Sequence, residues 1–433
     1  MVKYFRIYVL LAVAAVPATT IQSCTKSDFT GPTLASNDVN NKRTFTINPD
    51  EEITLESKFI KPEQLSFEWS MEGQILAKEG TSYRFKSKES GSYIVTQRVY
   101  NGIAEVYIDY YITVRGTYDS GTFIFTNNSS ESQLTFINKD NTKVDENAYK
   151  TANPGKSIGA KISSATAFYG KMYILTESEI IVLNAITLKE INRIATPAKP
   201  NYLINVDRSS ALLSTDKGVY RVSISPLAIT GQVLGLNGRV GMMVKNENYV
   251  MALTLNGLAA INKSTLLLTR FINSGKLGLV ADIAGNVWTT NEDTIISVSP
   301  TLYVTKFKNT NSPHATASWN PWNEGTLTLS TTENALLFIK ANNNGTPSQT
   351  ICKVDISNPR NLGITEFITL PKDRQFTGIG FRINSENNIV ASTVNSSGND
   401  PQAVIYRSGD ATLVTTVATT ATDVKSFLFN KTN

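Results

Sequence analysis

The stretch that decides the fold of this chain comprises Pro200-Asn-Tyr-Leu-Ile-Asn-Val206, Ser210-Ala-Leu-Leu-Ser-Thr215, Gly218-Val-Tyr-Arg-Val222 and Thr230-Gly-Gln-Val233. These are four short apolar runs separated by turn residues, which is the pattern of four antiparallel strands. The same unit recurs between residues 278 and 307. Its period of roughly 37 to 50 residues is typical of the four-stranded blades of a β-propeller.

The first strand of each unit can be counted along the chain. Seven examples lie near Ile162–Phe168, Tyr202–Val206, Val240–Val244, Leu277–Asp282, Ala315–Trp319, Thr377–Ile383 and Val424–Phe429. The run Gly121–Thr126 resembles a second strand, and the last run, Val424–Phe429, is a first strand without a second. Together the two runs would complete one sheet and remove an exposed sheet edge. The sequence thus predicts an all-β chain with a seven-bladed propeller over residues 117–433, closed by this latch between its ends. Eight blades are the alternative, if residues 332–385 contain a further hairpin.

Residues 45–116 precede the repeats and show a different organisation. Alternating apolar and polar positions predict strands at Thr44–Ile47, Ile53–Ser57, Leu65–Trp69, Tyr83–Phe85, Gly91–Val99 and Val106–Val114. Short strands in close succession favour a small antiparallel sandwich. We expect Trp69 and Tyr93 to be core aromatics of this unit, without a ligand role.

The N-terminus has the features of a bacterial lipoprotein signal. Lys3 and Arg6 precede a short apolar run, and Ile21-Gln-Ser-Cys24 follows it. Such a segment is cleaved before the cysteine, which then carries the lipid. We therefore expect a signal peptide over residues 1–23, lipidation at Cys24 and a polar linker over residues 24–44. An ordinary signal peptide or a short membrane helix is the alternative, although the apolar run is short for a membrane span.

Two resemblances to known families rest on particular motifs. Leu65-x-Phe-x-Trp69, Tyr83-x-Phe85 and Gly91-x-Tyr93-x-Val95 resemble a PKD-like domain of the immunoglobulin type. Trp319-Asn-Pro-Trp-Asn-Glu-Gly-Thr-Leu327 and Gly378-Ile-Gly-Phe-Arg382 resemble YVTN/YncE-like propeller lipoproteins of Bacteroides-type cell surfaces. The second resemblance implies binding for TonB-dependent uptake rather than catalysis, since a relative captures vitamin B12 and others are typically encoded beside outer-membrane uptake systems.

Composition narrows the possible chemistry. The 433 residues carry a net charge of only +5, without basic blocks, so nothing indicates nucleic-acid binding. A single histidine, His314, and two cysteines, Cys24 and Cys352, disfavour a His-based triad or a His/Cys zinc site. We expect no cofactor, no metal and no catalytic residue. A carboxylate pair for glycoside hydrolysis stays open, because folding decides the separation of such groups.

Almost every loop that leads into a first strand carries a cation or a histidine. These residues are Lys156, Lys199, Arg239, Lys276, His314 and Arg374, with Lys425 just inside the last strand. Like charges that converge on one mouth of a propeller channel would favour an anionic ligand. The alternative is that these are ordinary lysines on the surface loops of a basic protein.

Aromatic residues beside amides are further candidates for ligand contact. We expect Phe376 to join the cationic mouth and Trp322, in a Pro/Asn/Gly turn, to be a secondary site. Trp319 would pack between blades.

The function expected from these features is capture of a glycan, a corrinoid or a similar nutrient by a lipid-anchored protein of the outer membrane, at the cell surface or on its periplasmic side. A transporter would be the partner. The alternatives are an adhesion propeller that binds other proteins and a hydrolase or lyase on a propeller scaffold.

Overall fold

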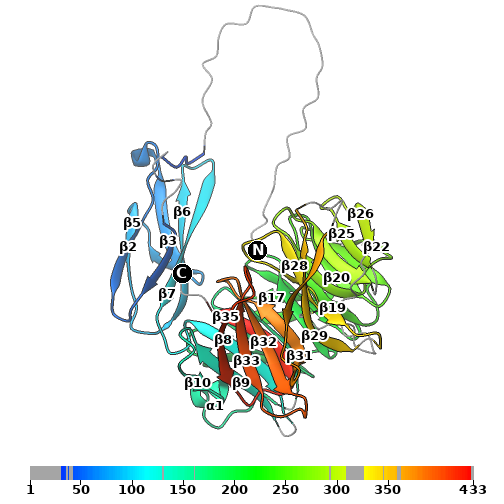
Figure 1. Ribbon diagram of the computed structural model, residues 1–433. Coiled ribbons are helices and arrows are strands. Elements are labelled where there is room, and N and C mark those ends of the chain that lie inside the picture. The colour runs from blue at the N-terminus through cyan, green and yellow to red at the C-terminus, as the bar shows by residue number, and fades with distance from the viewer. Residues whose placement is uncertain are drawn as a thin grey trace, which may run out of the picture.

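The computed structural model describes residues 31–35, 38, 42–128, 131–159, 161–291, 294–308, 326–344, 346–357 and 362–430. Regular structure in these residues is almost entirely β-strand, apart from the short helix α1 (Ala148–Ala152) and a 3-10 turn at Pro62–Gln64. A pair of N-terminal sheets is followed by seven four-stranded sheets (Figure 1).

The N-terminal sheets have the order β1-β7-β6-β3-β4 and β2-β5. Their strands are β1 (Thr44–Ile47), β2 (Glu52–Glu56), β3 (Ser66–Met71), β4 (Gln74–Ala77), β5 (Ser82–Lys86), β6 (Gly91–Tyr100) and β7 (Glu105–Val114). Trp69 is fully buried in their common core, and its indole N–H donates to the carbonyl of Gly80 at 3.0 Å. Tyr93 packs against the same core, partly buried. Both aromatics therefore lie where the alternating pattern placed them.

Each of the seven following sheets consists of four strands. The first is β10 (Val144–Asp145), β9 (Ser132–Asn138), β8 (Gly121–Asn127) and β35 (Val424–Asn430). The next three are β11 (Ile162–Phe168), β12 (Lys171–Thr176), β13 (Glu179–Asn184) and β14 (Glu190–Ala195); β15 (Pro200–Asn205), β16 (Ser210–Thr215), β17 (Gly218–Ile224) and β18 (Leu227–Gln232); and β19 (Val240–Lys245), β20 (Tyr249–Thr254), β21 (Gly257–Asn262) and β22 (Leu268–Ile272). The last three are β23 (Leu277–Ala281), β24 (Val287–Asn291), β25 (Thr294–Val298) and β26 (Val304–Lys308); β27 (Thr328–Leu329), β28 (Ala335–Ala341), β29 (Pro347–Asp355) and β30 (Ile364–Thr369); and β31 (Arg374–Ile383), β32 (Asn388–Asn395), β33 (Gln402–Arg407) and β34 (Leu413–Ala418).

Burial within these sheets explains their sequence pattern. Second strands such as β12 and β20 are buried at nearly every position, because neighbouring sheets cover both of their faces. Strands covered on both faces have continuous apolar runs rather than alternation. Fourth strands such as β14 and β22 lie at the edge of their sheets and are exposed or half-buried at nearly every position.

The first strands of the sheets form a closed series. In sequence order, β11, β15, β19, β23, β27, β31 and β35 each contact the next, and β35 contacts β11. The sheet containing β35 joins the two ends of this region, because β35 pairs antiparallel with β8, Phe427 lying opposite Ile124. Gly121 begins β8 with a φ of 153°, and a Cβ there would lie 2.2 Å from the carbonyl oxygen of Ile137. Only glycine therefore fits at this junction.

The sheet β27–β30 corrects one sequence expectation. Its first strand is β27, Thr328–Leu329, whereas the sequence placed the first strand at Ala315–Trp319, which lies outside the described residues. The run after residue 325 is therefore the first strand of the sheet and not the second. Residues 335–383 supply only β28, β29, β30 and the first strand of the next sheet, so the part of this segment that the structure describes contains no additional hairpin.

The N-terminal sheets, and the segment that links β7 to β8, contact two of the four-stranded sheets. Arg208, in the β15–β16 loop, pairs with Asp109 of β7 at 2.6 Å and donates to the hydroxyl of Tyr111 at 3.0 Å. The backbone N–H of Tyr118 donates to the carbonyl of Ile186 at 3.1 Å. These contacts lie at the ends of the sheets where first strands finish and second strands begin.

Candidate functional site

The cations predicted to line one mouth are mostly neutralised by nearby carboxylates. Arg239 Nε lies 3.2 Å from Asp216 Oδ1, and Lys425 Nζ lies 2.8 Å from Asp423 Oδ1. Lys156 Nζ lies 3.3 Å from Glu190 Oε1. Paired charges on a surface produce far less long-range potential than isolated ones. The convergent positive field expected from the sequence is correspondingly weakened.

Glu190 belongs to a network of hydrogen bonds and ion pairs that stabilises the fold. Arg193 binds this carboxylate at 2.9 Å, and the hydroxyl of Tyr149 in α1 donates to it. Burial by itself would raise the pKa of Glu190, but the hydrogen bonds from Arg193 and Tyr149 outweigh it and hold the pKa below its ordinary value. Lys156 therefore completes a network that ties α1 to the neighbouring sheet.

Two of the predicted site residues are built into the fold. Arg374 is 9% exposed, and its guanidinium binds Asp400 Oδ2 at 2.7 Å and the hydroxyl of Thr393 at 2.8 Å. Phe376 is buried in the core between β31 and its neighbours. The expectation that Phe376 contacts a ligand is thereby corrected, because its side chain faces the interior of the sheet packing.

The remaining predicted residues are divided between exposed positions and parts outside the structure. Lys199 and Lys276 lie exposed in the loops before β15 and β23. Cys24, His314 and Trp322 lie outside the described residues. The predicted cations that the structure describes therefore lie on different sheets, and most of them are paired with a carboxylate.

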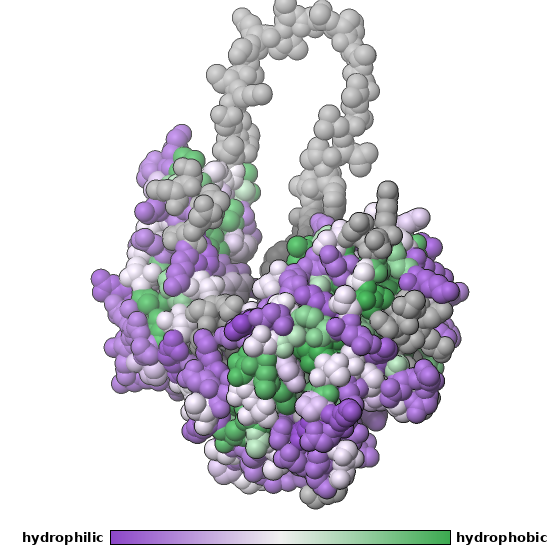
Figure 2. Space-filling model, in the orientation of Figure 1, coloured by the Kyte–Doolittle hydropathy of each residue, from purple (hydrophilic) through white to green (hydrophobic). Residues whose placement is uncertain are grey.

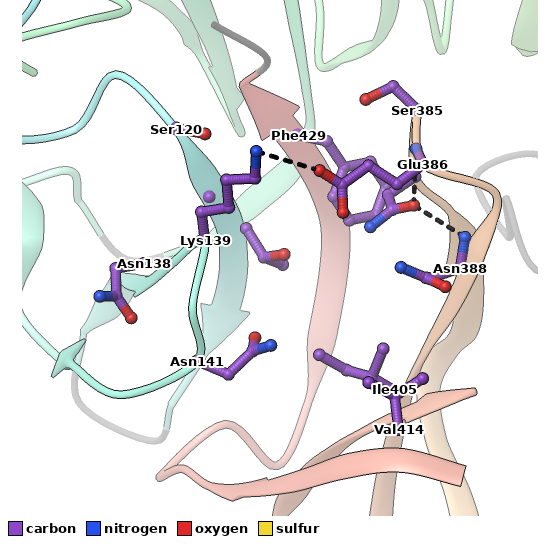
Figure 3. A pocket seen from close by; sticks show the side chains of 13 residues that line it. Ser120, Asn138, Lys139, Asn141, Ser385, Glu386, Asn388, Ile405, Val414 and Phe429 are labelled. Carbon is purple, nitrogen blue, oxygen red and sulfur yellow. Dashed lines mark hydrogen bonds and ion pairs between the residues drawn. The ribbon is translucent and has the colours of Figure 1, made fainter. Parts of the chain in front are cut away.

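A polar pocket of about 270 Å³ lies at the opposite ends of the strands from these cations (Figure 3). It lies between the sheet β31–β34 and the sheet that joins β35 to β8. We call it the asparagine pocket; its lining is Ser120, Gly121, Thr122, Asn138, Lys139, Asn141, Asn384, Ser385, Glu386, Asn388, Ile405, Val414 and Phe429. Arg374 begins β31 and Asn384 directly follows its last residue, which separates the predicted mouth from the pocket by the length of the strand.

Two asparagine-capped turns shape the asparagine pocket. The side-chain oxygen of Asn138 accepts the backbone N–H groups of residues 142 and 143, both at 2.9 Å. The side-chain oxygen of Asn384 accepts those of Glu386 and Asn388 at 3.0 and 2.8 Å. Asparagine favours such turns because its short side chain replaces a backbone acceptor. Each turn thus holds its charged residue, Lys139 or Glu386, in a defined place.

Lys139 and Glu386 face each other from the two turns, their charged atoms 3.6 Å apart (Figure 3). The side chains remain 58% and 49% exposed, so solvent and ligands reach both. Phe429, Ile405 and Val414 provide an apolar surface next to these polar groups. Figure 2 shows a hydrophobic area on this face of the molecule with hydrophilic residues around it. Amides, a balanced ion pair and an apolar surface suit a neutral ligand with many hydroxyl groups.

This pocket was not predicted from the sequence, because only clustered cations and exposed aromatic residues were considered as ligand-binding candidates. The signal was the concentration of asparagine and serine in two turns, Asn138–Asn141 and Asn384–Asn388, far apart in sequence. Only the pairing of β35 with β8 brings these turns to neighbouring sheets.

Two features are absent from the part of the chain that the structure describes. It contains no group of three or more His, Cys, Asp or Glu side chains placed to hold a metal ion. None of its helices has the length and apolar character needed to cross a membrane.

Comparison with known proteins places the region of the four-stranded sheets in a family. A family described as a domain of unknown function, DUF5074, matches residues 120–429. No curated protein matches the chain.

Solved structures with similar folds share little sequence with the chain. A quinoprotein alcohol dehydrogenase-like protein from Bacteroides thetaiotaomicron matches with a TM-score of 0.59 and 16% identity, covering 93% of this chain and 99% of that one. The extracellular domain of a one-component system from B. thetaiotaomicron matches with a TM-score of 0.45 and 14% identity, covering 70% and 46% of the two chains. PorZ, a surface component of the type-IX secretion system of Porphyromonas gingivalis, matches with a TM-score of 0.42 and 12% identity, covering 76% and 44%. The first likeness shows that the chain has an all-β, propeller-like fold.

Proposed function

The chain belongs to the DUF5074 family, and we propose that this member is a non-catalytic binding protein that captures a neutral, polyhydroxylated nutrient such as a glycan. The asparagine pocket is the proposed binding site. The observation that carries the proposal is the ion pair between Lys139 and Glu386, which faces the amides and the apolar surface of this pocket. A sugar hydroxyl donates to a carboxylate and accepts from an ammonium group, so one such pair binds both ends of a vicinal diol.

The charge balance of the pocket favours a neutral ligand over the anionic ligand considered from the sequence. Lys139 and Glu386 are the only Lys, Arg, Asp or Glu residues among the described lining residues, and they compensate each other. The volume of about 270 Å³ is near the lower limit of ligand pockets, which favours one or two sugar rings over a macrocycle such as a corrinoid.

Binding without catalysis is favoured by the carboxylate inventory of the same pocket. Glycoside hydrolysis generally uses two carboxylates on either side of the scissile bond. Among the described lining residues, Glu386 is the only carboxylate, and Lys139 already holds it as an ion pair.

The architecture proposed for this function is a seven-bladed propeller preceded by a PKD-like spacer. The closed series of contacts among seven first strands supports the blade count. The sandwich-like arrangement of β1 to β7 around Trp69 supports the spacer. In this arrangement the spacer holds the propeller at a distance from the membrane.

Attachment to the outer membrane is the remaining part of the proposal. Lys3, Arg6 and the motif ending at Cys24 support a lipid anchor, which would retain the protein beside an outer-membrane transporter. The ligand would then pass from the pocket to that transporter.

The proposal is tested by titrating the protein without residues 1–24 against glycans, corrinoids and siderophores. Binding of neutral glycans, weakened in Lys139→Ala and Glu386→Ala, supports it. The matched control is Lys340→Ala, which removes a surface ion pair of 2.6 Å with Glu366 on another sheet. No binding in any of the three classes by a folded protein would contradict it.

A further inference from the structure

A second hollow lies between the sheet β23–β26 and the sheet β27–β30. It has a volume of about 690 Å³, within the range of about 300–1,000 Å³ that is typical of small-molecule sites. We call it the tryptophan groove; Trp288, Ser297, Thr305 and Phe307 line one side, and Asn334 and Ile356 line the other.

The groove exists because two small residues, Ser297 and Thr305, follow Trp288 in one row across the sheet β23–β26. Trp288, Ser297 and Thr305 are direct cross-strand neighbours on β24, β25 and β26. Neighbouring sheets stand about 10 Å apart, and large side chains normally fill the space between them. Ser297 and Thr305 are too short to reach Ile356 on the facing sheet, so the space beyond Trp288 remains open.

The aromatic floor of the groove is held in a fixed orientation. The indole N–H of Trp288 donates to Asp282 Oδ2 at 2.8 Å, and Phe307 stacks on the indole with ring centroids 6.0 Å apart and an interplanar angle of 24°. Trp288 is 3% exposed, which means that packing limits its motion. The buried indole supports the partly exposed ring of Phe307, which gives the groove a rigid aromatic surface suited to a planar ring.

The polar groups of the groove are uncharged or already satisfied. Asp282 accepts the backbone and side-chain N–H groups of Asn286 at 2.9 and 3.0 Å in addition to the indole. The hydroxyls of Ser297 and Thr305 make no hydrogen bond to any described residue and are partly exposed. They therefore remain open to a ligand, whereas the carboxylate is occupied.

The rim of the groove carries large apolar side chains in water. Ile283 is 101% exposed and Tyr303 is 73% exposed, on the loops that follow β23 and precede β26. Exposed apolar residues beside a cavity commonly mark a binding site. They would cover a ligand that rests on the aromatic floor.

We propose that the tryptophan groove is a second binding site, which takes an uncharged ligand with a planar ring system and a hydroxyl or carbonyl group at its edge. Phe307, supported from behind by Trp288, stacks against the ring, and Ser297 and Thr305 bind the polar edge. This site is separate from the asparagine pocket and does not depend on the function proposed for that pocket.

The experiment uses 2-naphthol as the probe and naphthalene-2-sulfonate as its charged counterpart, with the purified protein. Binding is followed by calorimetry and by quenching of tryptophan fluorescence. We expect saturable binding of one 2-naphthol, with the sulfonate at least tenfold weaker. Trp288→Phe should remove most of the quenching while binding persists.

Two variants of the groove and two control variants decide whether the groove binds 2-naphthol. Ser297→Leu fills the hollow and should weaken 2-naphthol binding at least tenfold. Thr305→Val keeps the shape and removes the hydroxyl, which should weaken binding about 2- to 10-fold. The control, Thr269→Leu on the exposed strand β22, should leave binding unchanged, as should Lys139→Ala in the asparagine pocket.

The proposal is overturned if the folded protein does not bind 2-naphthol, which would leave the groove to another occupant such as a side chain of a partner protein. Unchanged binding in Ser297→Leu with native near-ultraviolet circular dichroism would also overturn it. If Ser297→Leu does not fold, Thr305→Val decides, because a hydroxyl-to-methyl change at a partly exposed strand position preserves the packing. Unchanged affinity in Thr305→Val then counts against the proposal.

Discussion

Lys139 and Glu386 form an ion pair of 3.6 Å between two loops that are far apart in the sequence. The pair exists because β35, near the C-terminus, pairs with β8 and places the loop after β9 beside the loop after β31. Exposed pairs of this kind contribute about 0 to 1 kcal/mol to stability. The pair therefore adds little to folding stability, and its two charged groups remain accessible for the ligand contact proposed above.

Arg374 is expected to act in stability and not in ligand binding. Arg374→Met removes the charge-assisted hydrogen bonds that a nearly buried guanidinium makes to Asp400 and Thr393, which should lower the free energy of unfolding by about 2 kcal/mol in urea titrations. Arg407→Met is the matched control, since its pair with Asp410 at 3.2 Å is mostly exposed, and we expect less than about 0.5 kcal/mol. Normal stability combined with lost ligand affinity in Arg374→Met would restore the role first expected from the sequence.

Phe427 is expected to be a main stabilising residue of the sheet that joins the two ends. The side chain is 1% exposed on β35, so Phe427→Ala should lower the free energy of unfolding by about 3 to 5 kcal/mol. Phe271→Ala serves as the control, because that ring is 49% exposed. A difference of less than about 1 kcal/mol between the two variants would show that the β35–β8 pairing does not hold the ring of sheets closed.

The positions of most strands could be predicted from the sequence. Runs such as Ile162–Phe168 and Thr44–Ile47 coincide with β11 and β1, because short β-branched segments between turn residues have few other structures available. The error at Ala315–Trp319 arose because Thr328–Leu329 forms a first strand too short to stand out as a periodic run.

The candidate site was less accessible to sequence reasoning. Arg374 and Phe376 looked like loop residues that could reach a ligand, but the strand begins at Arg374 and buries both. Whether a cation is neutralised depends on partners such as Asp400, 26 positions away, and spacing in the sequence does not predict that contact.

Arg208 is expected to couple the N-terminal sheets to the propeller-like region. It binds Asp109 and Tyr111 across the contact, so Arg208→Ala should reduce the free energy of unfolding by about 1 to 2 kcal/mol. Small-angle scattering should show a wider range of arrangements of the two units. Arg84→Ala, which affects only an exposed pair with Glu52 at 3.5 Å, provides the comparison. If both variants scatter like the unmodified protein, Arg208 is not needed for the coupling.

Cys352 is expected to be unreactive in the folded protein. The thiol is fully buried on β29, and burial raises its pKa from 9.0 to about 11. At pH 8 only about one molecule in a thousand would carry the reactive thiolate. In protein without Cys24, a disulfide reagent should therefore label no thiol before denaturation and one thiol after it.

The same shift sets a pH dependence for stability. The folded state holds the thiol proton of Cys352 more tightly than the unfolded state does. The stability that the protonated thiol contributes is therefore fully present below pH 9.0 and is lost as the pH rises toward about 11. Rapid labelling of the native protein at pH 8 would contradict the burial of Cys352.

The most direct measurement is calorimetric titration of a neutral glycan, identified in the ligand screen, into the unmodified protein and three variants. Lys139→Ala and Glu386→Ala should each weaken binding by about tenfold, because each removes one charged hydrogen-bond partner of the ligand. Lys340→Ala should bind like the unmodified protein. Equal affinity in all four proteins would contradict the assignment of the asparagine pocket as the binding site.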